Sequence, residues 1–337
     1  MRSLIKKTFT SLLLRVPDAF FEAPLHVRSG RITPVLLYHT VGESEANPLV
    51  GKHIHTVSLE TFSEHLRVLK KFFTIVSLAE ILDRLQNGKT VRGLAAITFD
   101  DGYRSVFAKA LPILQSLDMP FTAFLVSRIV QKQAFWRDKI RWVLHNNLTE
   151  PFIAYGKKIH PSFASIRQDR FYQDTKNPVL MNSKLVDQAL DSFIADTKQQ
   201  DAVRAAGELV YCREEDIKRA DSPLVSFGNH TANHYVLSSL SEEEQYREIH
   251  DGHTFLERLG KTPNPFFSVP FGGQTDFNKA TLNIIRDAGY AGYLLSEYRI
   301  NVFPRGAHAS RFLQGVSLNR FMPPDDAKRF YFQLLRY

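Results

Sequence analysis

Three short stretches of the sequence carry side chains that could bind a metal ion or move protons. The first is the segment 98–103, Thr-Phe-Asp-Asp-Gly-Tyr, which contains the adjacent carboxylates Asp100 and Asp101. Neighbouring carboxylates repel each other unless a cation neutralises one of them, which leaves the other free to act as a base. Because Asp-Gly also favours turns, a plain helix cap is the competing interpretation.

The second stretch places two histidines four residues apart, at His230 and His234. Histidines at this spacing share one face of a helical turn and can converge on a single metal ion. The spacing alone is weak evidence, since His250 and His253 show how easily paired histidines arise. Two imidazoles and one carboxylate would form a three-ligand site with a position left for water, as catalytic zinc requires.

The third stretch is the segment 268–273, Ser-Val-Pro-Phe-Gly-Gly. A Pro-Phe-Gly turn at the end of a strand can present backbone N–H groups to a developing oxyanion. Without further context, an ordinary Pro-Gly turn explains the same residues.

Each of these stretches directly follows a segment that reads as a strand. Strand-like apolar runs alternate with helical patterns along most of the chain, which favours a parallel α/β fold, and the number of units indicates a barrel. In such a barrel the carboxyl ends of the strands meet at one face, so the three stretches should form one site. The expected strands cover 34–39, 73–77, 94–99, 121–126, 223–227, 266–269 and 290–296, and the expected helices 59–72, 78–85, 105–117, 241–260 and 276–288.

Residues 127–222 interrupt this alternation. The stretch begins with the aromatic and charged run Phe135 to Asp138 and then becomes largely helical, and it is too long for a plain loop. We therefore predict an inserted helical subdomain beside the active face. The resulting domain organisation is an amphipathic segment at 1–33, a barrel at 34–321 that contains the insertion, and a tail at 322–337.

The composition narrows the class of protein and its surroundings. The chain has 337 residues, 44% of them hydrophobic and 23% charged, as in globular proteins with a substantial core. A single cysteine excludes an intramolecular disulfide framework and a cysteine-built zinc site. No apolar run is long enough to span a membrane and no signal-peptide core is evident, so the default location is the cytoplasm.

The net charge of +8 and the pI near 9.4 suit an anionic partner. The basic residues are dispersed and no nucleic-acid-binding motif is present, which argues against nucleic acid. The segment from Leu4 to Leu14 has an apolar face beside Lys6 and Lys7. This segment either contacts an anionic membrane surface peripherally or covers the domain's own core.

Together, the Thr-Phe-Asp-Asp-Gly-Tyr and His-Thr-x-x-His motifs, in this order, resemble the polysaccharide deacetylases, the NodB-homology family of carbohydrate esterase family 4. The resemblance covers about 34–126 and 223–321 and leaves the insertion outside. It implies a distorted (β/α) barrel that removes acetyl groups from N-acetylated sugars of a polysaccharide or lipid-linked glycan. The expected context is bacterial surface-glycan biosynthesis.

The resemblance also implies roles for individual residues. Asp101, His230 and His234 would bind the metal, Asp100 would be the general base, and the backbone N–H of Phe271 would help to hold the oxyanion. Zinc is the expected metal in this nitrogen-rich site, although cobalt, nickel or manganese can also support such chemistry.

The sequence departs from the family pattern at two positions. The family often has an arginine at the start of the third motif, where this chain has Ser268, and Arg320 is the candidate replacement. The late histidine that often serves as the acid is missing. Here His39, at the end of the first strand, is the candidate acid, although a lone histidine there is more often a core residue; His308 is the next candidate.

Two other functions share these residues. One is a different C–N hydrolase of the same family, such as a deformylase or an imidase. The other is a non-catalytic glycan-binding barrel, which Ser268 would fit; the intact Asp100 argues against it, since a binding module needs no base.

Overall fold

Buried apolar segments form two parallel sheets in the computed structural model, which describes residues 17, 19–42, 46–51, 54–131, 133–304 and 315–336. The predicted parallel α/β architecture is confirmed. The first sheet has the strand order β1 (Val35–Tyr38), β5 (Leu94–Phe99), β6 (Phe121–Leu125) and β7 (Val225–Asn229), with β4 (Thr74–Ile75) beside β5. The second has the order β8 (Phe266–Ser268), β9 (Gly292–Leu295) and β10 (Val316–Asn319).

Isolated bridges join the two sheets into a distorted barrel. Leu36 of β1 pairs in parallel with Phe321, just after β10, and Phe227 of β7 pairs with Pro263, just before β8. The barrel is therefore closed by short contacts rather than by full ladders. A small pair, β2 (Thr40–Val41) and β3 (Thr56–Val57), follows the end of β1.

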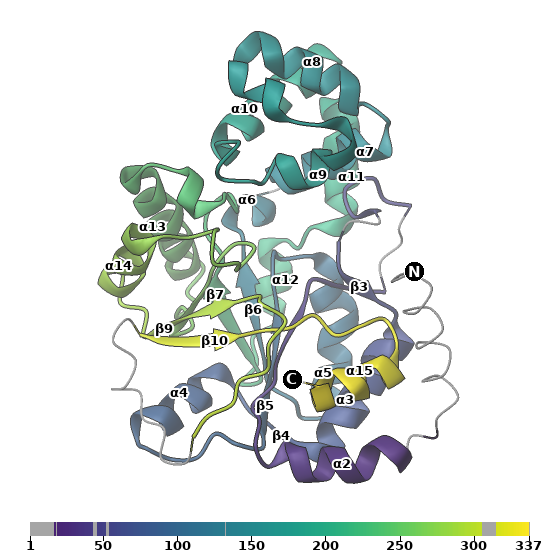
Figure 1. Cartoon of the computed structure of the whole chain (residues 1–337), viewed down its shortest axis with the longest axis vertical. Coiled ribbons are helices and arrows are strands. Elements are labelled where there is room, and N and C mark those ends of the chain that lie inside the picture. Colours follow the sequence, from purple (N-terminus) through teal and green to yellow (C-terminus); the bar gives the residue numbers. More distant parts are fainter. Residues whose placement is uncertain are drawn as a thin grey trace.

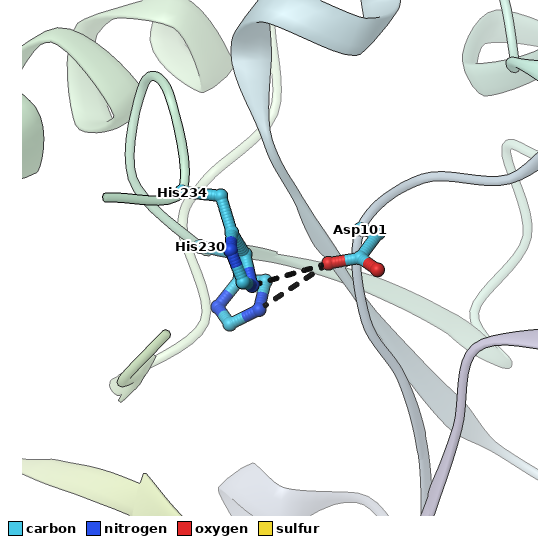
Figure 2. A group of neighbouring side chains, drawn as sticks. All are labelled: Asp101, His230 and His234. Atoms are coloured by element: carbon cyan, nitrogen blue, oxygen red, sulfur yellow. Dashed lines mark ion pairs between the residues drawn. The ribbon is translucent and has the colours of Figure 1, made fainter. Parts of the chain in front are cut away.

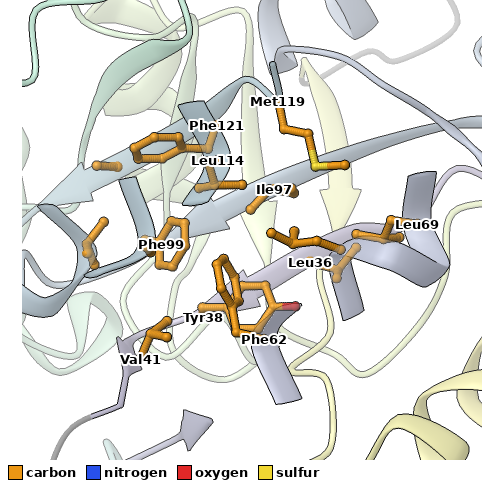
Figure 3. Close-up of a cluster of buried hydrophobic side chains, with 14 of the residues drawn as sticks. Leu36, Tyr38, Val41, Phe62, Leu69, Ile97, Phe99, Leu114, Met119 and Phe121 are labelled. Carbon is orange, nitrogen blue, oxygen red and sulfur yellow. The ribbon is translucent and has the colours of Figure 1, made fainter. Parts of the chain in front are cut away.

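The strands are apolar on both faces because both faces are covered. Every residue of β1, β5 and β6 is buried, as expected for parallel strands between helices. Figure 3 shows side chains of these strands packed with Phe62 and Leu69 of α3 (Leu59–Phe72) and Leu114 of α5 (Leu111–Ser116). This packing fixes the positions of the strand ends that carry the site.

Local sequence signals explain several helix boundaries. Ser58 and Ser77 cap α3 and α4 (Leu78–Gln86) by accepting hydrogen bonds from the third residue of the following turn. Ser241 and Glu244 form the predicted capping box at the start of α13 (Glu242–Arg258).

Other boundaries differ from the sequence predictions. Helix α14 (Lys279–Asp287) starts three residues later than expected because Asn278 supplies its cap. The expected helix at 105–117 begins as a π-helical turn (Val106–Ala110) and continues as α5. The expected strand at 73–77 is reduced to β4, whose Thr74 is exposed.

The stretch 127–222 is helical, with its larger helices gathered at one end of the molecule (Figure 1). Its aromatic residues share one buried cluster with barrel residues such as Val269 and Ile249. The insertion comprises α6 (Ser127–Val130), α7 (Trp136–His145), α8 (Thr149–Ile159), α9 (Phe171–Asp174), α10 (Ser183–Asp196), α11 (Gln200–Val210) and α12 (Glu214–Arg219).

Both ends of the described chain lie against the barrel. Helix α15 (Ala327–Arg336), in the segment expected to be a tail, buries Phe330, Tyr331 and Leu334 and packs near α2 (Ala19–Ser29) and α3. The predicted amphipathic stretch from Leu4 to Leu14 lies outside the described residues. Within the described chain, no helix has the length and apolar character needed to cross a membrane.

Candidate metal centre and active site

The carboxyl ends of five parallel strands converge on one cavity. His39 follows β1, Asp100 follows β5, His230 follows β7, Ser268 ends β8 and Arg320 follows β10. The strand order therefore brings together residues that are up to 281 positions apart along the chain, as predicted for the carboxyl face of a barrel.

Asp101, His230 and His234 form a compact buried cluster (Figure 2). One potential ligand atom from each residue lies within 4.8 Å of the others. Asp101 Oδ1 is 3.6 Å from His230 Nε2 and 3.5 Å from His234 Nε2. The structure thus brings together the three residues predicted as metal ligands.

The chemistry of this cluster fits a divalent cation. Burial lowers the pKa of both histidines, so the imidazoles are neutral and each has a nitrogen lone pair. His230 Nδ1 lies 2.9 Å from the carbonyl oxygen of Ser268; it must donate there, which leaves Nε2 as the ligand atom. Asp101 Oδ1 is buried without a hydrogen-bond partner among the described residues.

The pKa of Asp101 shows the same need for a cation. Burial and the charge of Asp100 raise its pKa to about 7, so its carboxylate is difficult to keep ionised next to two neutral imidazoles. A cation would stabilise the ionised form and use the unpaired oxygen. Two nitrogens and one carboxylate oxygen match the ligand set of catalytic zinc sites.

The two histidines do not lie on a helix, contrary to the sequence prediction. They belong to a loop in which Thr231 and His234 have positive φ angles of 70° and 61°. Such angles are uncommon for residues other than glycine and need support from the surroundings. The rings converge, with centroids 4.7 Å apart, because of this loop conformation rather than because of helical periodicity.

Hydrogen bonds hold the loop in place. Asn229 Oδ1 accepts a bond from the backbone N–H of Thr231 (2.8 Å), and Thr231 Oγ1 accepts one from the N–H of His234 (2.8 Å). Glu248 of α13 accepts a bond from the N–H of Asn233 (2.9 Å). Gly252 allows α13 to approach closely, since a Cβ atom there would lie 2.2 Å from Asn229 Oδ1.

Asp100 is held in a different way from its neighbour. Arg320 donates two hydrogen bonds of 2.7 Å to its two carboxylate oxygens, and Ser268 Oγ donates one of 3.1 Å. Arg320 also donates to Ser268 Oγ (2.9 Å), so the three side chains form one network. The arginine predicted to replace the missing one is therefore in contact with Asp100, and Ser268 supports it.

This network determines the charge of Asp100. Burial alone would raise its pKa, but the charge and hydrogen bonds of Arg320, together with His230 and His39, outweigh burial and lower the pKa to about 2. The two adjacent aspartates thus differ: the pKa of Asp100 is lowered to about 2, whereas that of Asp101 is raised to about 7.

His39 lines the same cavity and is half-buried. Its Nδ1 has no hydrogen-bond partner among the described residues. Burial lowers its pKa to about 3, although the charge of Asp100 acts in the opposite direction. His39 is therefore neutral in the resting site. His308, the other candidate acid, lies outside the described residues.

Phe271 lies at a turn with a positive φ of 63°. Its ring packs on His234 with centroids 4.7 Å apart, and it lines the cavity. Within the described part of the chain, the hydrogen bonds of the neighbouring backbone, such as Ser296 N–H to the carbonyl of Gly272 (2.9 Å), do not involve the N–H of Phe271.

The insertion contributes residues that the sequence analysis did not assign to the site. Trp136 Nε1 donates a hydrogen bond to the carbonyl of His234 (2.8 Å), and the ring of Phe135 packs 5.2 Å from that of His234. Asp138 accepts bonds from Tyr103 (2.9 Å) and from Arg141. The dense aromatic and charged run at 135–138 was the available signal, but nothing in its spacing indicated a partner.

The cavity enclosed by these groups has a volume of about 180 Å³. Sites that enclose a drug-sized ligand usually measure roughly 300–1,000 Å³. The cavity can therefore hold only part of a large substrate.

A sequence model of the polysaccharide deacetylases matches residues 87–293, which is more than half of the chain. The chain belongs to the polysaccharide deacetylase family. The predicted family is confirmed, and this deacetylase is a hydrolase that acts on non-peptide C–N bonds of the N-acetyl type. No curated protein sequence shows significant similarity to it.

Solved structures of low sequence identity share the fold of the deacetylase. The deacetylase PplD of Streptococcus pyogenes, solved with acetate, is 16% identical, with a TM-score of 0.57 over 91% of this chain and 99% of the other. IcaB from Ammonifex degensii is 17% identical, with a TM-score of 0.56 over 92% and 99%. BC0361, a polysaccharide deacetylase from Bacillus cereus, is 14% identical, with a TM-score of 0.55 over 91% and 69%.

Proposed function

We propose that this polysaccharide deacetylase is a metal-dependent N-deacetylase that converts N-acetylated sugar residues of a bacterial surface glycan, polymeric or lipid-linked, to free amino sugars. The observation that supports this most strongly is the separation of two roles in adjacent residues. Asp101 lies beside both His230 and His234, whereas both oxygens of Asp100 are held by Arg320 and one of them approaches His230 Nε2 (3.4 Å). A binding module needs neither a cation site nor an ionised base next to it.

Asp101, His230 and His234 would hold the metal, most readily zinc because two of the ligands are nitrogens. When bound, a divalent cation polarises the acetamide carbonyl and makes water a better nucleophile. Asp100 accepts the proton of the attacking water. Arg320 acts as a positioning residue, since it fixes the orientation of Asp100 and keeps it ionised.

The other two residues act on the two ends of the scissile bond. The backbone N–H of Phe271 donates a hydrogen bond to the carbonyl oxygen as negative charge develops there. The C–N bond then breaks, acetate retains the oxygen of the water, and His39 delivers a proton to the departing amine. Because the pKa of His39 is about 3, the ring must first take up a proton during turnover, which the charge of Asp100 favours.

Acetate release from a panel of N-acetylhexosamine glycans tests this function. The zinc-loaded protein should release acetate from at least one of them, and Asp100→Asn should reduce the rate about 100- to 10,000-fold because the base is removed. Asp118→Asn is the matched control, since Asp118 is exposed and precedes the amino end of β6, whereas the site lies at the carboxyl ends of the strands. Bound zinc should be unchanged in both variants.

Two results would contradict the proposal. Full activity of Asp100→Asn would show that another group is the base. Release of formate, or ring opening of a cyclic imide, without any release of acetate would assign the protein to the other C–N hydrolases of the family.

A further inference from the structure

The insertion brings positive charge to the wall of the catalytic cavity. Arg137, on the first turn of α7, and Lys176, in the turn after α9, both line the cavity that contains Asp100 and the metal-site histidines. Arg137 is 1% exposed and Lys176 is half-buried. Burying a cation is costly unless an anion or strong acceptors compensate it.

Arg137 has no carboxylate partner within the described chain. Its guanidinium donates to Thr175 Oγ1 (3.2 Å) and to the carbonyl of Tyr172 (3.0 Å) and also interacts with the Tyr172 phenol, while its buried Nε has no partner among the described residues. The next cations on the same helix are different: Lys139 lies 2.5 Å from Asp187, and Arg141 pairs with Asp138. Among the described residues, Arg137 is thus the cation of α7 that faces the cavity without a carboxylate partner.

Aromatic rings hold these cations in place without adding a carboxylate. The guanidinium of Arg137 lies 3.9 Å from the centre of the Tyr172 ring and 4.9 Å from that of Trp136. Lys176 Nζ lies 5.0 Å from the centre of the Phe271 ring. Cation–π contacts of this kind orient a cation without removing its attraction for an anion.

The ionisation of neighbouring groups indicates the same surplus of positive charge. Burial raises the pKa of the Tyr172 phenol, but the charges of Arg141, Arg137 and Lys176 outweigh it and lower the pKa to about 7. The pKa of Lys176 is itself lowered, by burial and by repulsion from Arg137.

This charge lies close to the site of reaction. The ring of Phe271 packs on His234 (4.7 Å between centroids) on one side, and the guanidinium of Arg137 lies 5.7 Å from the centre of the same ring. A group bound at Arg137 is therefore separated from the metal ligands by about one aromatic ring, a distance that a single sugar residue can bridge.

We propose that Arg137 and Lys176 form an anion subsite that binds a carboxylate or phosphate group on the N-acetylated substrate, so that the enzyme prefers acidic or phosphate-bearing sugars to neutral ones. This inference rests on the proposed function, because the subsite is defined relative to the acetamido group that reacts. Arginine suits the role because its guanidinium presents several N–H donors in a planar arrangement that matches carboxylate and phosphate oxygens.

The test compares three substrates with the zinc-loaded full-length protein: neutral di-N-acetylchitobiose, N-acetylglucosaminuronic acid and N-acetylglucosamine 1-phosphate. The kcat/KM should be at least about tenfold higher for one or both anionic substrates, mainly through a lower KM. The preference should be lost in Arg137→Gln, and it should be reduced in Lys176→Gln and in Arg137→Lys, since lysine keeps the charge without the planar set of donors. Which anionic substrate is preferred distinguishes a carboxylate from a phosphate subsite.

Binding without turnover gives a second readout. Calorimetric titration should compare the Kd of the same two anionic sugars for the Asp100→Asn variant and for the double variant that also carries Arg137→Gln. The Kd should be at least about tenfold lower for the single variant, which keeps Arg137. Lys158→Gln, an exposed position on α8, is the matched control for loss of a positive charge in the insertion. Lys176→Gln keeps the test decisive if Arg137→Gln does not fold, because Lys176 is only half-buried.

The outcomes separate the two proposals. Equal kcat/KM for neutral and anionic substrates, with the same ratio in Lys176→Gln, would overturn the subsite and leave the deacetylase function intact. Tight binding of the anionic sugars that depends on Arg137, without acetate release from any substrate, would overturn the proposed function and leave the subsite intact.

Discussion

At the scale of single residues, the two adjacent aspartates show how the surroundings assign chemistry to identical side chains. Asp100 faces Arg320, which lowers its pKa to about 2, whereas the pKa of Asp101 is raised to about 7 by burial and by Asp100. Asp101 has a positive φ of 75°, and its Oδ1 lies 3.5 Å from His234 Nε2. These surroundings support the proposal that Asp101 serves as a ligand and Asp100 as a base.

Replacing either metal-site histidine should remove most of the bound metal. His230→Ala or His234→Ala leaves only two protein ligands, which hold a labile divalent ion poorly, so acetate release should also be nearly abolished. Elemental analysis of the purified variants measures this directly, with His145→Ala, an exposed position on α7, as the control. Full metal occupancy in both variants would show that the ligands are other residues.

His39→Ala should separate proton delivery from metal binding. His39 lines the cavity, and its Nδ1 has no hydrogen-bond partner among the described residues. We therefore expect the turnover rate of the variant to fall by up to about 100-fold while the bound metal stays unchanged. Steady-state kinetics together with elemental analysis measure both quantities. A turnover rate equal to that of the unmodified protein would make His39 a core residue, as lone histidines after strands often are.

At the scale of elements, local signals in the sequence predicted most of the barrel. β5 has the predicted bounds, and the capping box of α13 was predicted from Ser241 and Glu244. The metal-site loop was predicted for the wrong reason: its geometry depends on Asn229 and on contacts with α13, which spacing in the sequence does not contain. For the same reason, the contact of Trp136 with His234 could not be predicted, since nothing local couples residues 98 positions apart.

Helix α7 should influence the metal site through Trp136. Trp136→Phe removes the hydrogen bond to the carbonyl of His234 but keeps an aromatic ring in the buried cluster. Metal affinity should fall about tenfold, as is typical when a partner that orients a ligand is lost. Competition with a chromophoric chelator measures the affinity, and Trp142→Phe is the control in the same helix. Equal affinities in the two variants would leave Trp136 with a packing role only.

Glu248 of α13 should make the stability of the folded protein depend on pH. Burial raises its pKa to about 7 in the folded protein, although bonds from Asn233 act in the opposite direction. The pKa of Glu248 is about 7 in the folded state and about 4.5 in the unfolded state, so the folded state binds the proton more tightly. This difference stabilises the fold fully below pH 4.5, and the stabilisation is lost as the pH rises from there through 7. The free energy of unfolding should thus lose on the order of 3 kcal/mol across this window from this group.

Denaturant unfolding of the metal-free protein at several pH values between 4.5 and 8 tests this prediction. Glu248→Gln should have a flatter pH dependence, because the amide does not ionise and still accepts one bond from Asn233. Glu243→Gln, at an exposed position on the same helix, should follow the unmodified protein. Identical slopes for the Glu248 and Glu243 variants would show that other groups cause the dependence.

At the scale of the whole molecule, the insertion is joined to the barrel by function and by packing. It supplies Trp136 to the metal-site loop, and its Asp138 binds Tyr103 of the catalytic motif. One buried cluster runs from insertion residues such as Phe152 to barrel residues such as Phe267. The proposed boundaries at 127 and 222 therefore mark an insertion in the sequence. In the structure, however, the hydrophobic core of this insertion is continuous with that of the barrel.

This continuity predicts that the insertion and the barrel unfold together. Both tryptophans of the chain, Trp136 and Trp142, lie in α7, so intrinsic fluorescence reports on the insertion, whereas far-ultraviolet circular dichroism reports on all helices. The two denaturant transitions should coincide in midpoint and slope, because opening the insertion would expose the shared cluster. In the Trp142→Phe variant, fluorescence reports on Trp136 alone, which contacts the barrel through its hydrogen bond to His234. The midpoint of its fluorescence transition should again coincide with that of the circular dichroism transition. A fluorescence transition at clearly lower denaturant concentration would show instead that the insertion is a separate folding unit. Arg137 and Lys176 would then belong to a part of the molecule that can unfold independently of the barrel.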